Sequence, residues 1–202
     1  MTAAILLAAG ASRRMGRPKL ELRLGGLTVL QRSLECLLAS RVDPVVMVVS
    51  PGGEKLSAFR SQSGVRVVVN PRAYEGMASS IRAGVAALPD QAEAVLIALA
   101  DKPLVQPATV RAVVSRFEQT GAPVVYPTYR KGQGHPVLIA RALFGELLGL
   151  SGDSGAKGVI RKHAAAAVAV EVDDPGVLLD IDTAEDYAKL LQIDGGSKDK
   201  PS

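Results

Sequence analysis

A cluster of basic side chains follows a short run of small residues near the N-terminus. Ala8, Ala9 and Gly10 let a ligand approach the backbone closely, and successive amide groups in such a turn can form an anion-binding nest. Arg14 and Lys19 would supply cations for phosphate oxygens. The pattern favours a phosphate-binding loop, with a solvated basic turn as the alternative.

Two aspartates are candidate ligands for Mg²⁺. Asp101 follows the apolar run Ala94–Leu99, so we expect its carboxylate at the carboxyl end of a strand, beside the N-terminal loop. Mg²⁺ usually takes one or two protein carboxylates and fills its other positions with water and phosphate oxygens. Asp182 is the candidate for the second ligand, although Asp180–Thr183 also has the composition of a turn that caps a helix.

The sequence lacks the patterns of two common nucleotide-binding loops. Neither a Walker A sequence nor Gly-x-Gly-x-x-Gly is present, so P-loop hydrolysis and dinucleotide binding lose their main support. No obvious general base or nucleophile is present either. A phosphate monoester needs no base, because its second pKa of about 6 leaves it largely ionised at neutral pH. The candidate residues therefore suit transfer onto a phosphate, through positioning and charge neutralisation.

Apolar runs and helical patterns alternate along the chain. Runs without strict polar alternation are typical of strands buried on both faces. The expected strands are Ala3–Leu7, Val45–Val49, Val65–Val69, Ala94–Leu99, Pro123–Tyr126, His135–Ile139 and Ala167–Val172. The expected helices are a stripe from Leu30 to Leu38 capped by Thr28, then Ser79–Leu88, Pro107–Gln119, Arg141–Leu150, Gly155–Lys162 and Thr183–Leu191. This alternation predicts an α/β fold with a mainly parallel sheet and some antiparallel pairing late in the chain.

The composition is that of one ordinary globular domain. The chain has 202 residues, 48% of them hydrophobic and 22% charged, and one core can serve a chain of this length. We expect a single domain over residues 1–194 and a disordered polar tail over 195–202. Cys36 is the only cysteine and lies in a helical apolar pattern, so we expect a buried structural thiol.

Composition also argues against two kinds of partner. With three Phe, four Tyr and no Trp, the chain could hardly build base-stacking platforms, so we expect no nucleic-acid partner. No apolar run approaches the roughly 18 residues of a membrane span, and Ala3–Ala9 lacks the basic segment that precedes a signal peptide's apolar core. We therefore expect no membrane partner and a cytoplasmic location.

The N-terminal loop, Leu7-Ala8-Ala9-Gly10-x-Ser12-x-Arg14-Met15-Gly16-x-x-Lys19, resembles the signature loop of the molybdenum cofactor nucleotidyltransferases. That family lies within the Rossmann-like nucleotidyltransferases. Later segments match it in order: Gly76–Ile81, Asp101–Pro103, Gly134–Val137, Gly152–Ala156 and Asp180–Thr183. The resemblance spans nearly the whole chain and implies a Rossmann-like three-layer sandwich that carries a single nucleotidyltransferase domain.

The resemblance also implies site residues. Those for the nucleotide are Leu7, Ala8, Ala9, Gly10, Ser12, Arg14, Lys19, Gly76, Ser79, Ser80 and Asp101. The catalytic residues among them are Arg14, Lys19 and Asp101. Asp101 and Asp182 would hold the Mg²⁺ cofactor, and His135 would contact the acceptor. From residue type alone, Ser79 and Ser80 would instead cap a helix and His135 would be structural.

The resemblance implies a particular reaction. Ala8-Ala9-Gly10 is similar to the branch that uses CTP, and a methyl group at Ala9 could narrow the pocket toward a pyrimidine. The implied acceptor is molybdopterin, and the implied product is its cytosine dinucleotide. A possible partner is a molybdenum hydroxylase that receives the product. The alternatives are a guanylyltransferase, a sugar-phosphate or isoprenoid-phosphate nucleotidyltransferase, and a non-catalytic chaperone that delivers the molybdenum cofactor.

Overall fold

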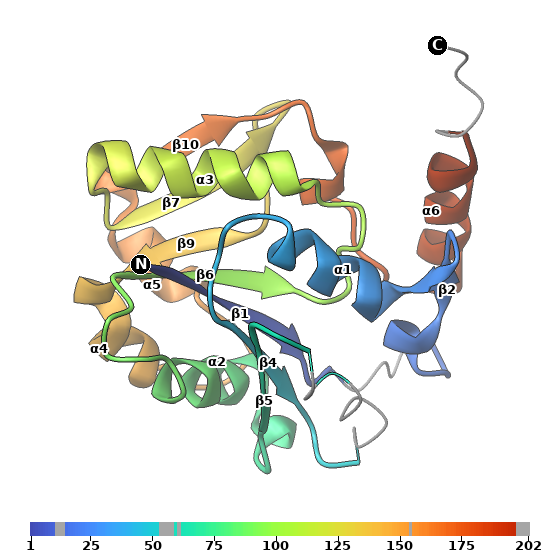
Figure 1. Cartoon of the computed structure of the whole chain (residues 1–202), viewed down its shortest axis with the longest axis horizontal. Coiled ribbons are helices and arrows are strands. Elements are labelled where there is room, and N and C mark those ends of the chain that lie inside the picture. Colours follow the sequence, from blue (N-terminus) through green and yellow to red (C-terminus); the bar gives the residue numbers. More distant parts are fainter. Residues whose placement is uncertain (11–14, 53–58, 60–61, 154, 197–202) are drawn as a thin grey trace.

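The computed structural model describes residues 1–10, 15–52, 59, 62–153 and 155–196, and its centre is one mixed β-sheet (Figure 1). In spatial order the strands are β10 (Val168–Glu171), β7 (Val124–Tyr129), β9 (Val137–Ala140), β6 (Ala94–Leu99), β1 (Thr2–Ala8), β4 (Val45–Val49) and β5 (Val65–Val69), with β8 (Gly132–Gln133) paired to β7. β9 is antiparallel to β6 and β7, whereas β1 is parallel to β4 and β6. The predicted α/β fold with a mainly parallel, mixed sheet is confirmed.

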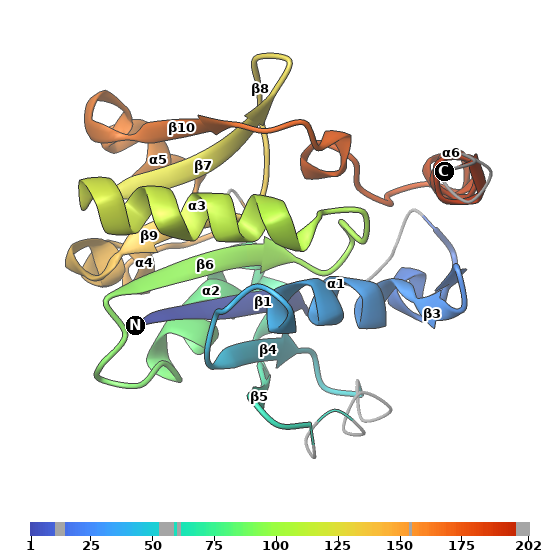
Figure 2. The same cartoon turned by 45° about the horizontal axis from the view of Figure 1, so that its top comes forward.

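Helices cover both faces of this sheet (Figures 1 and 2). The α-helices are α1 (Val29–Leu38), α2 (Met77–Ala86), α3 (Pro107–Thr120), α4 (Phe144–Leu148), α5 (Lys157–Lys162) and α6 (Ala184–Gly196). Short 3-10 turns are η1 (Lys19–Glu21), η3 (Ala73–Glu75), η4 (Arg141–Leu143), η5 (Ala164–Ala166) and η6 (Pro175–Val177). Helices α1 and α3 pack on one face of the sheet, and α2, α4 and α5 on the other, which gives three layers.

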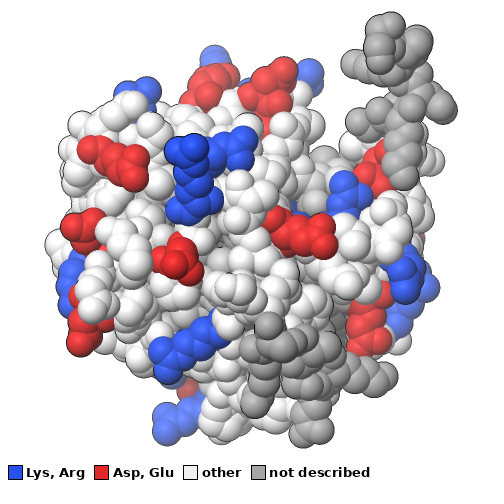
Figure 3. All heavy atoms as spheres, viewed as in Figure 1, with Lys and Arg blue, Asp and Glu red and all other residues white. Residues whose placement is uncertain are grey.

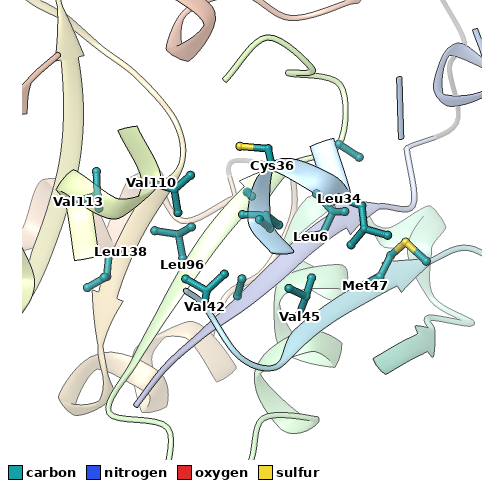
Figure 4. Close-up of a cluster of buried hydrophobic side chains, with 14 of the residues drawn as sticks. Leu6, Leu34, Cys36, Val42, Val45, Met47, Leu96, Val110, Val113 and Leu138 are labelled. Atoms are coloured by element: carbon teal, nitrogen blue, oxygen red, sulfur yellow. The ribbon is translucent and has the colours of Figure 1, made fainter. Parts of the chain in front are cut away.

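Two hydrophobic cores follow from the strands' two buried faces. Every residue of β4 is buried, and alternate side chains point into opposite cores: Met47 joins the cluster under α1 and α3, while Val46 joins the other. Figure 4 shows the first cluster, in which Leu6 of β1 and Leu96 of β6 face Leu34 of α1 and Val110 of α3. The continuous apolar runs in the sequence therefore reflect strands covered on both sides.

The thiol of Cys36 lies within the first core (Figure 4). Burial is the main reason that the pKa of this thiol rises to about 12, so it is protonated at neutral pH. The predicted role as a buried structural residue agrees with this position.

Most helix boundaries lie near the predicted ones. Thr28 caps α1 through a capping box with Gln31, as expected: the Gln31 amide donates to Thr28 Oγ1 over 3.1 Å and the Thr28 amide donates to Gln31 Oε1 over 2.7 Å. The region 141–150 differs, because a 3-10 turn precedes a helix of five residues there. Helix α6 continues through Gly195 and Gly196, the first two residues of the predicted disordered tail; residues 197–202 lie outside the described residues.

Helix α6 packs beside a small hairpin at one end of the molecule (Figures 1 and 2). The hairpin pairs β2 (Arg23–Leu24) with β3 (Leu27–Thr28). A third apolar cluster joins Leu24, Val29, Ile181 and Leu190. This cluster holds the start of α6, and with it the neighbouring Asp182, close to η1.

Basic and acidic side chains are interspersed over the face of the molecule seen in Figure 3. The formal net charge of +4 is therefore not gathered into one basic patch on that face.

A connecting segment, residues 174–182, runs across the carboxyl end of β6 and is fixed at several points. Asp174 is 2% exposed, and its carboxylate accepts hydrogen bonds from the Gln106 amide (2.9 Å), Thr109 Oγ1 (2.6 Å) and the Gly176 amide (2.9 Å). Farther along, the Ile181 amide donates to the Asp101 carbonyl over 3.1 Å. We call residues 174–182 the crossing segment, because it brings Asp180 and Asp182 over the end of β6.

Replacing Asp174 with Ala should lower the free energy of unfolding by about 3 kcal/mol, because three buried or partly buried donors lose their charged acceptor. Urea unfolding of the purified variant measures this. The control is Asp173→Ala, which removes an exposed carboxylate from the neighbouring position and should change the value by less than about 0.5 kcal/mol. Equal effects of the two substitutions would contradict the role given to Asp174.

Candidate active site

Lys19 joins the two predicted metal ligands. Its Nζ donates to Asp101 Oδ2 over 2.7 Å and to Asp182 Oδ1 over 3.0 Å. The three residues come from η1, from the turn after β6 and from the crossing segment. The Ala100 amide donates to the Leu7 carbonyl over 3.1 Å, which ties the end of β6 to the end of β1. The structure therefore brings together three residues that the sequence analysis placed in the same site.

The ammonium of Lys19 is charged although it is only 9% exposed. Burial alone would lower its pKa, but the charge of Asp101, the hydrogen bonds to Asp101 and Asp182 and the charge of Asp182 outweigh burial and raise the pKa above 10.5. At neutral pH the group is thus a fixed positive charge between two carboxylates. Such a charge can also neutralise phosphate oxygens.

Asp101 has an unused acceptor. Its Oδ1 is buried and has no hydrogen-bond partner among the described residues. A buried carboxylate oxygen without a partner is costly, and a bound cation is one way to satisfy it. Among these residues no group of three or more His, Cys, Asp and Glu side chains could hold a metal, so a metal here would have few protein ligands. Mg²⁺ accepts such a site, since one or two carboxylates suffice for it.

A pocket of about 570 Å³ opens beside these residues, a volume within the usual range for small-molecule sites. Several residues predicted to bind the nucleotide line it: Leu7, Ala9, Gly10, Lys19, Gly76, Ser80 and Asp101. Other lining residues carried no predicted role: Leu20, Ser50, Pro51, Pro71, Ala73, Tyr74, Met77, Leu99 and Asp153. The pocket therefore extends from Asp101, past the carboxyl ends of β1 and β6, to the start of α2, and Asp182 is not among its lining residues.

Of the residues predicted to bind the nucleotide, two do not line the pocket and two more fall outside the described residues. Ala8 is 5% exposed and belongs to the core under α1 and α3. Side chains alternate between the two faces of a strand, and that of Ala8 faces this core. Ser79 is buried in the first turn of α2. Ser12 and Arg14 fall in the part of the chain that the structure does not describe.

The serines of α2 do not cap the helix, so that alternative is wrong. Helix α2 begins two residues earlier than predicted, at Met77, and its N-cap Gly76 makes no side-chain capping bond. Ser79 Oγ instead lies 2.8 Å from the carbonyl oxygens of both Arg72 and Gly76, and its single hydroxyl hydrogen can be donated to either one. Asn70 Nδ2 donates to both serine hydroxyls, over 2.9 Å to Ser79 and 3.1 Å to Ser80. This network fixes the pocket wall before α2.

The amides at the start of α2 are capped from a distant loop. The Met77 amide donates to Asp153 Oδ1 over 3.1 Å, and the Ala78 amide donates to the Gly152 carbonyl over 3.2 Å. Gly76 has a φ of +99°, and a β-carbon there would come within 2.5 Å of Asp153 Oδ1. Only glycine fits this crossing of two chain segments. Sequence reasoning gave Asp153 no role, because a contact across 76 residues leaves no local signal.

Tyr74 is a pocket residue that the sequence analysis missed. It lies in η3 and is 79% exposed, although large exposed aromatic side chains have a cost in water. The exposure of this ring at the edge of the pocket is a property of the folded chain, and the count of three Phe and four Tyr gave no signal for it.

Asp182 is not the residue that caps α6 in its first turn. Thr183 Oγ1 accepts from the Asp186 amide over 3.2 Å, and Asp186 Oδ2 accepts from the Thr183 amide over 2.9 Å and from the Asp182 amide over 3.2 Å. Thr183 thus has the capping role predicted for it. The carboxylate of Asp182 is paired with Lys19.

His135 lies outside the large pocket. It precedes β9 instead of belonging to it, and its backbone amide donates to the Val177 carbonyl of the crossing segment over 3.1 Å. It lines a separate cavity of about 20 Å³ that it shares with Lys102. Burial and the charges of Lys102 and Lys157 lower the pKa of its imidazole to about 4, so the ring is neutral at neutral pH.

Solved structures define the class of this fold. Rv0371c from Mycobacterium tuberculosis H37Rv is 32% identical with a TM-score of 0.79, over 95% of this chain and 97% of that one. A nucleotidyl transferase from Methanothermobacter, Mth528, is 25% identical with a TM-score of 0.82, over 98% of this chain and 99% of that one. The fold is thus the Rossmann-like fold of nucleotidyltransferases.

The protein belongs to the MobA-like NTP transferase family, whose domain matches residues 4–168. Nicotine blue oxidoreductase of Paenarthrobacter nicotinovorans is 31% identical, over 93% of this chain and 95% of that protein. Purine catabolism protein PucB of Bacillus subtilis is also 31% identical, over 91% and 92%. Molybdenum cofactor cytidylyltransferase of Escherichia coli is 25% identical, over 91% and 92%. Within the family these relatives differ in name, so membership establishes a nucleotidyltransferase fold and leaves the substrate open.

In the part of the chain that the structure describes, no helix is both long enough and apolar enough to cross a membrane.

Proposed function

We propose that the protein transfers CMP from CTP to the phosphate of molybdopterin, which gives the cytosine dinucleotide form of the cofactor and pyrophosphate. The observation that carries the proposal is the cluster of Lys19, Asp101 and Asp182 at the edge of a pocket large enough for a nucleotide. Similarity to the cytidylyltransferase of Escherichia coli along nearly the whole chain supports the choice of substrates.

The reaction needs no general base. An oxygen of the acceptor phosphate attacks the α-phosphorus of CTP, and the bond from that phosphorus to the oxygen bridging to the β-phosphate breaks. Pyrophosphate leaves with that electron pair, and no proton has to move, because the acceptor is already ionised. Lys19, together with Arg14 of the N-terminal loop, neutralises the charge that develops on the departing pyrophosphate.

Asp101 and Asp182 would hold Mg²⁺. The buried Oδ1 of Asp101 is the atom that fits this role best, since it has no hydrogen-bond partner in the described residues. The bound ion would supply positive charge at the phosphates. A structure of Rv0371c in complex with manganese, 30% identical to this chain with a TM-score of 0.76, supports a divalent cation in this fold.

The base would lie toward the start of α2. Ala9, Gly76 and Ser80 line that part of the pocket, and Ser80 offers a hydroxyl that is held by Asn70. Ala9 lines the pocket, and we infer that its methyl group narrows the base site toward a pyrimidine. The residue at this position is the reason for proposing CTP over GTP.

Release of pyrophosphate tests the proposal directly. Purified protein is incubated with molybdenum-loaded molybdopterin, Mg²⁺ and each ribonucleoside triphosphate in turn, and release with CTP alone is expected. Release with GTP would overturn the base assignment while keeping the reaction. The control omits the acceptor, because release without it would mean hydrolysis.

A sibling reaction is the second candidate. A 2-C-methyl-D-erythritol 4-phosphate cytidylyltransferase of Streptomyces coelicolor is 37% identical over 134 residues, which is 62% of this chain and 49% of that protein. Replacing molybdopterin by this sugar phosphate in the same assay separates the two. If CTP binds but no phosphorylated acceptor supports release, the protein is better described as a carrier that delivers the cofactor to a molybdenum hydroxylase.

A further inference from the structure

Lys102 is a buried cation next to the candidate active site. It follows Asp101 at the carboxyl end of β6 and is only 7% exposed. Its amide donates to the Leu99 carbonyl over 3.2 Å, and this hydrogen bond closes the turn that contains Asp101 and ends β6. Lysine is among the residues least often buried, and a buried one usually has a close partner. Its position therefore calls for an explanation.

The partner that Lys102 has is a loose one. Its Nζ lies 3.9 Å from Asp180 Oδ1, beyond hydrogen-bond distance, and it makes no side-chain hydrogen bond within the described residues. The Asp180 side chain is 48% exposed, so much of its charge is solvated. The ammonium thus retains donors for a further anion.

The surroundings of Lys102 include charged residues of the candidate active site and also His135. Lys102 directly follows Asp101 in the chain, and Lys19 joins Asp101 to Asp182 through contacts of 2.7 Å and 3.0 Å. Lys102 and His135, the residue predicted to contact the acceptor, also line the same cavity of about 20 Å³, whose other lining residues are mainly apolar. Both aspartates would repel an approaching phosphate dianion. A cation beside these aspartates would reduce that repulsion.

We propose that Lys102 binds the phosphate group of the acceptor and holds it for attack on the nucleotide. This inference rests on the proposed function for the identity of the acceptor but needs only a phosphate for its test. Asp180 acts as the counter-ion of Lys102 until the acceptor arrives. Its exposed carboxylate turns toward water when the phosphate takes its place.

The test measures binding of inorganic phosphate to protein saturated with Mg²⁺ and a non-hydrolysable CTP analogue, so that the triphosphate site is full. Isothermal titration of the wild type and of Lys102→Met gives the two dissociation constants. We expect Lys102→Met to weaken phosphate binding about ten-fold or more, because one charge-assisted contact is lost. Lys189→Met, which removes an exposed lysine on α6, is the control and should leave the constant unchanged.

A second variant tests the same idea in the opposite direction. Asp180→Asn removes the competing carboxylate from an exposed position, so phosphate should bind a few-fold more tightly than to the wild type. Thermal unfolding of both variants checks that they are folded.

Either of two results would overturn the proposal: phosphate binding that Lys102→Met leaves unchanged, or a wild type that binds no phosphate beside the analogue. Failure of the proposed function looks different. If the CTP analogue does not bind, the titration is run without it, and the ratio between wild type and Lys102→Met still decides the role of Lys102.

Discussion

Asp101→Asn is expected to lower kcat for pyrophosphate release about 100- to 1,000-fold. Loss of one preorganised electrostatic contact in an active site has an effect of about this size. The amide has nearly the shape of the carboxylate but carries no charge. It would weaken the contact with Lys19 Nζ, now 2.7 Å, and replace one anionic oxygen by a donor that cannot bind a cation. Steady-state kinetics with CTP, molybdopterin and Mg²⁺ measure the loss.

A matched substitution separates this effect from a general loss of folded protein. Asp90→Asn changes the same charge at an exposed position in the turn before β6, and its kcat should stay within about two-fold of the wild type. Far-UV circular dichroism and thermal unfolding of Asp101→Asn should show a folded protein, since Lys19 keeps Asp182 as a partner. A folded Asp101→Asn enzyme with normal turnover would remove Asp101 from the mechanism.

The sequence predicted those parts of the site that adjoin regular elements. Strand β6 is a continuous apolar run, so its end and the position of Asp101 after it follow from local pattern alone. The same holds for β1 and for the pocket residues Leu7, Ala9 and Gly10 that follow or end it. Parallel strands share one carboxyl edge, which explains why two segments 80 or more residues apart could be placed together.

Long-range contacts explain what the sequence analysis missed. Asp153 caps α2 across 76 residues, and the pair of Asn70 with Ser79 and Ser80 depends on how the segment after β5 folds back. Local composition at Ser79 indicated a cap, since serine commonly has that role. In the structure Gly76 takes the N-cap position because its positive φ and close neighbours admit no other residue. At these positions tertiary contacts prevailed over the local preference of serine for the N-cap.

The crossing segment shows the same limit for Asp182. Its neighbours have the composition of a helix start, and a helix does start there, so local reasoning left metal binding and capping both open. The contacts in the folded chain distinguish the two roles. Thr183 and Asp186 satisfy the amides at the start of α6, and the fixed path from Asp174 to Ile181 places Asp182 next to Lys19. Neither Asp174 nor Ile181 carries a signal that predicts this.

Lys19→Met should reduce kcat about 100-fold while changing KM for CTP only a few-fold, because the charge on the departing phosphates grows in the transition state. Methionine keeps most of the apolar stem but leaves Asp101 and Asp182 without their shared cation. Lys19→Arg keeps the positive charge and should recover part of the kcat, although the planar guanidinium group differs in shape and hydrogen-bond geometry from the ammonium group. Turnover by Lys19→Met within a few-fold of normal at saturating substrates would exclude this role.

The combination of Lys19→Met with Asp101→Asn distinguishes a shared role from two separate ones. Two residues in direct contact should not act additively, so the double variant is expected to lose much less activity than the product of the two single losses. Each single change already disrupts the same pair of charges at the phosphates. A loss equal to that product would mean that Lys19 and Asp101 contribute independently, and that their 2.7 Å contact serves the folded state more than the reaction.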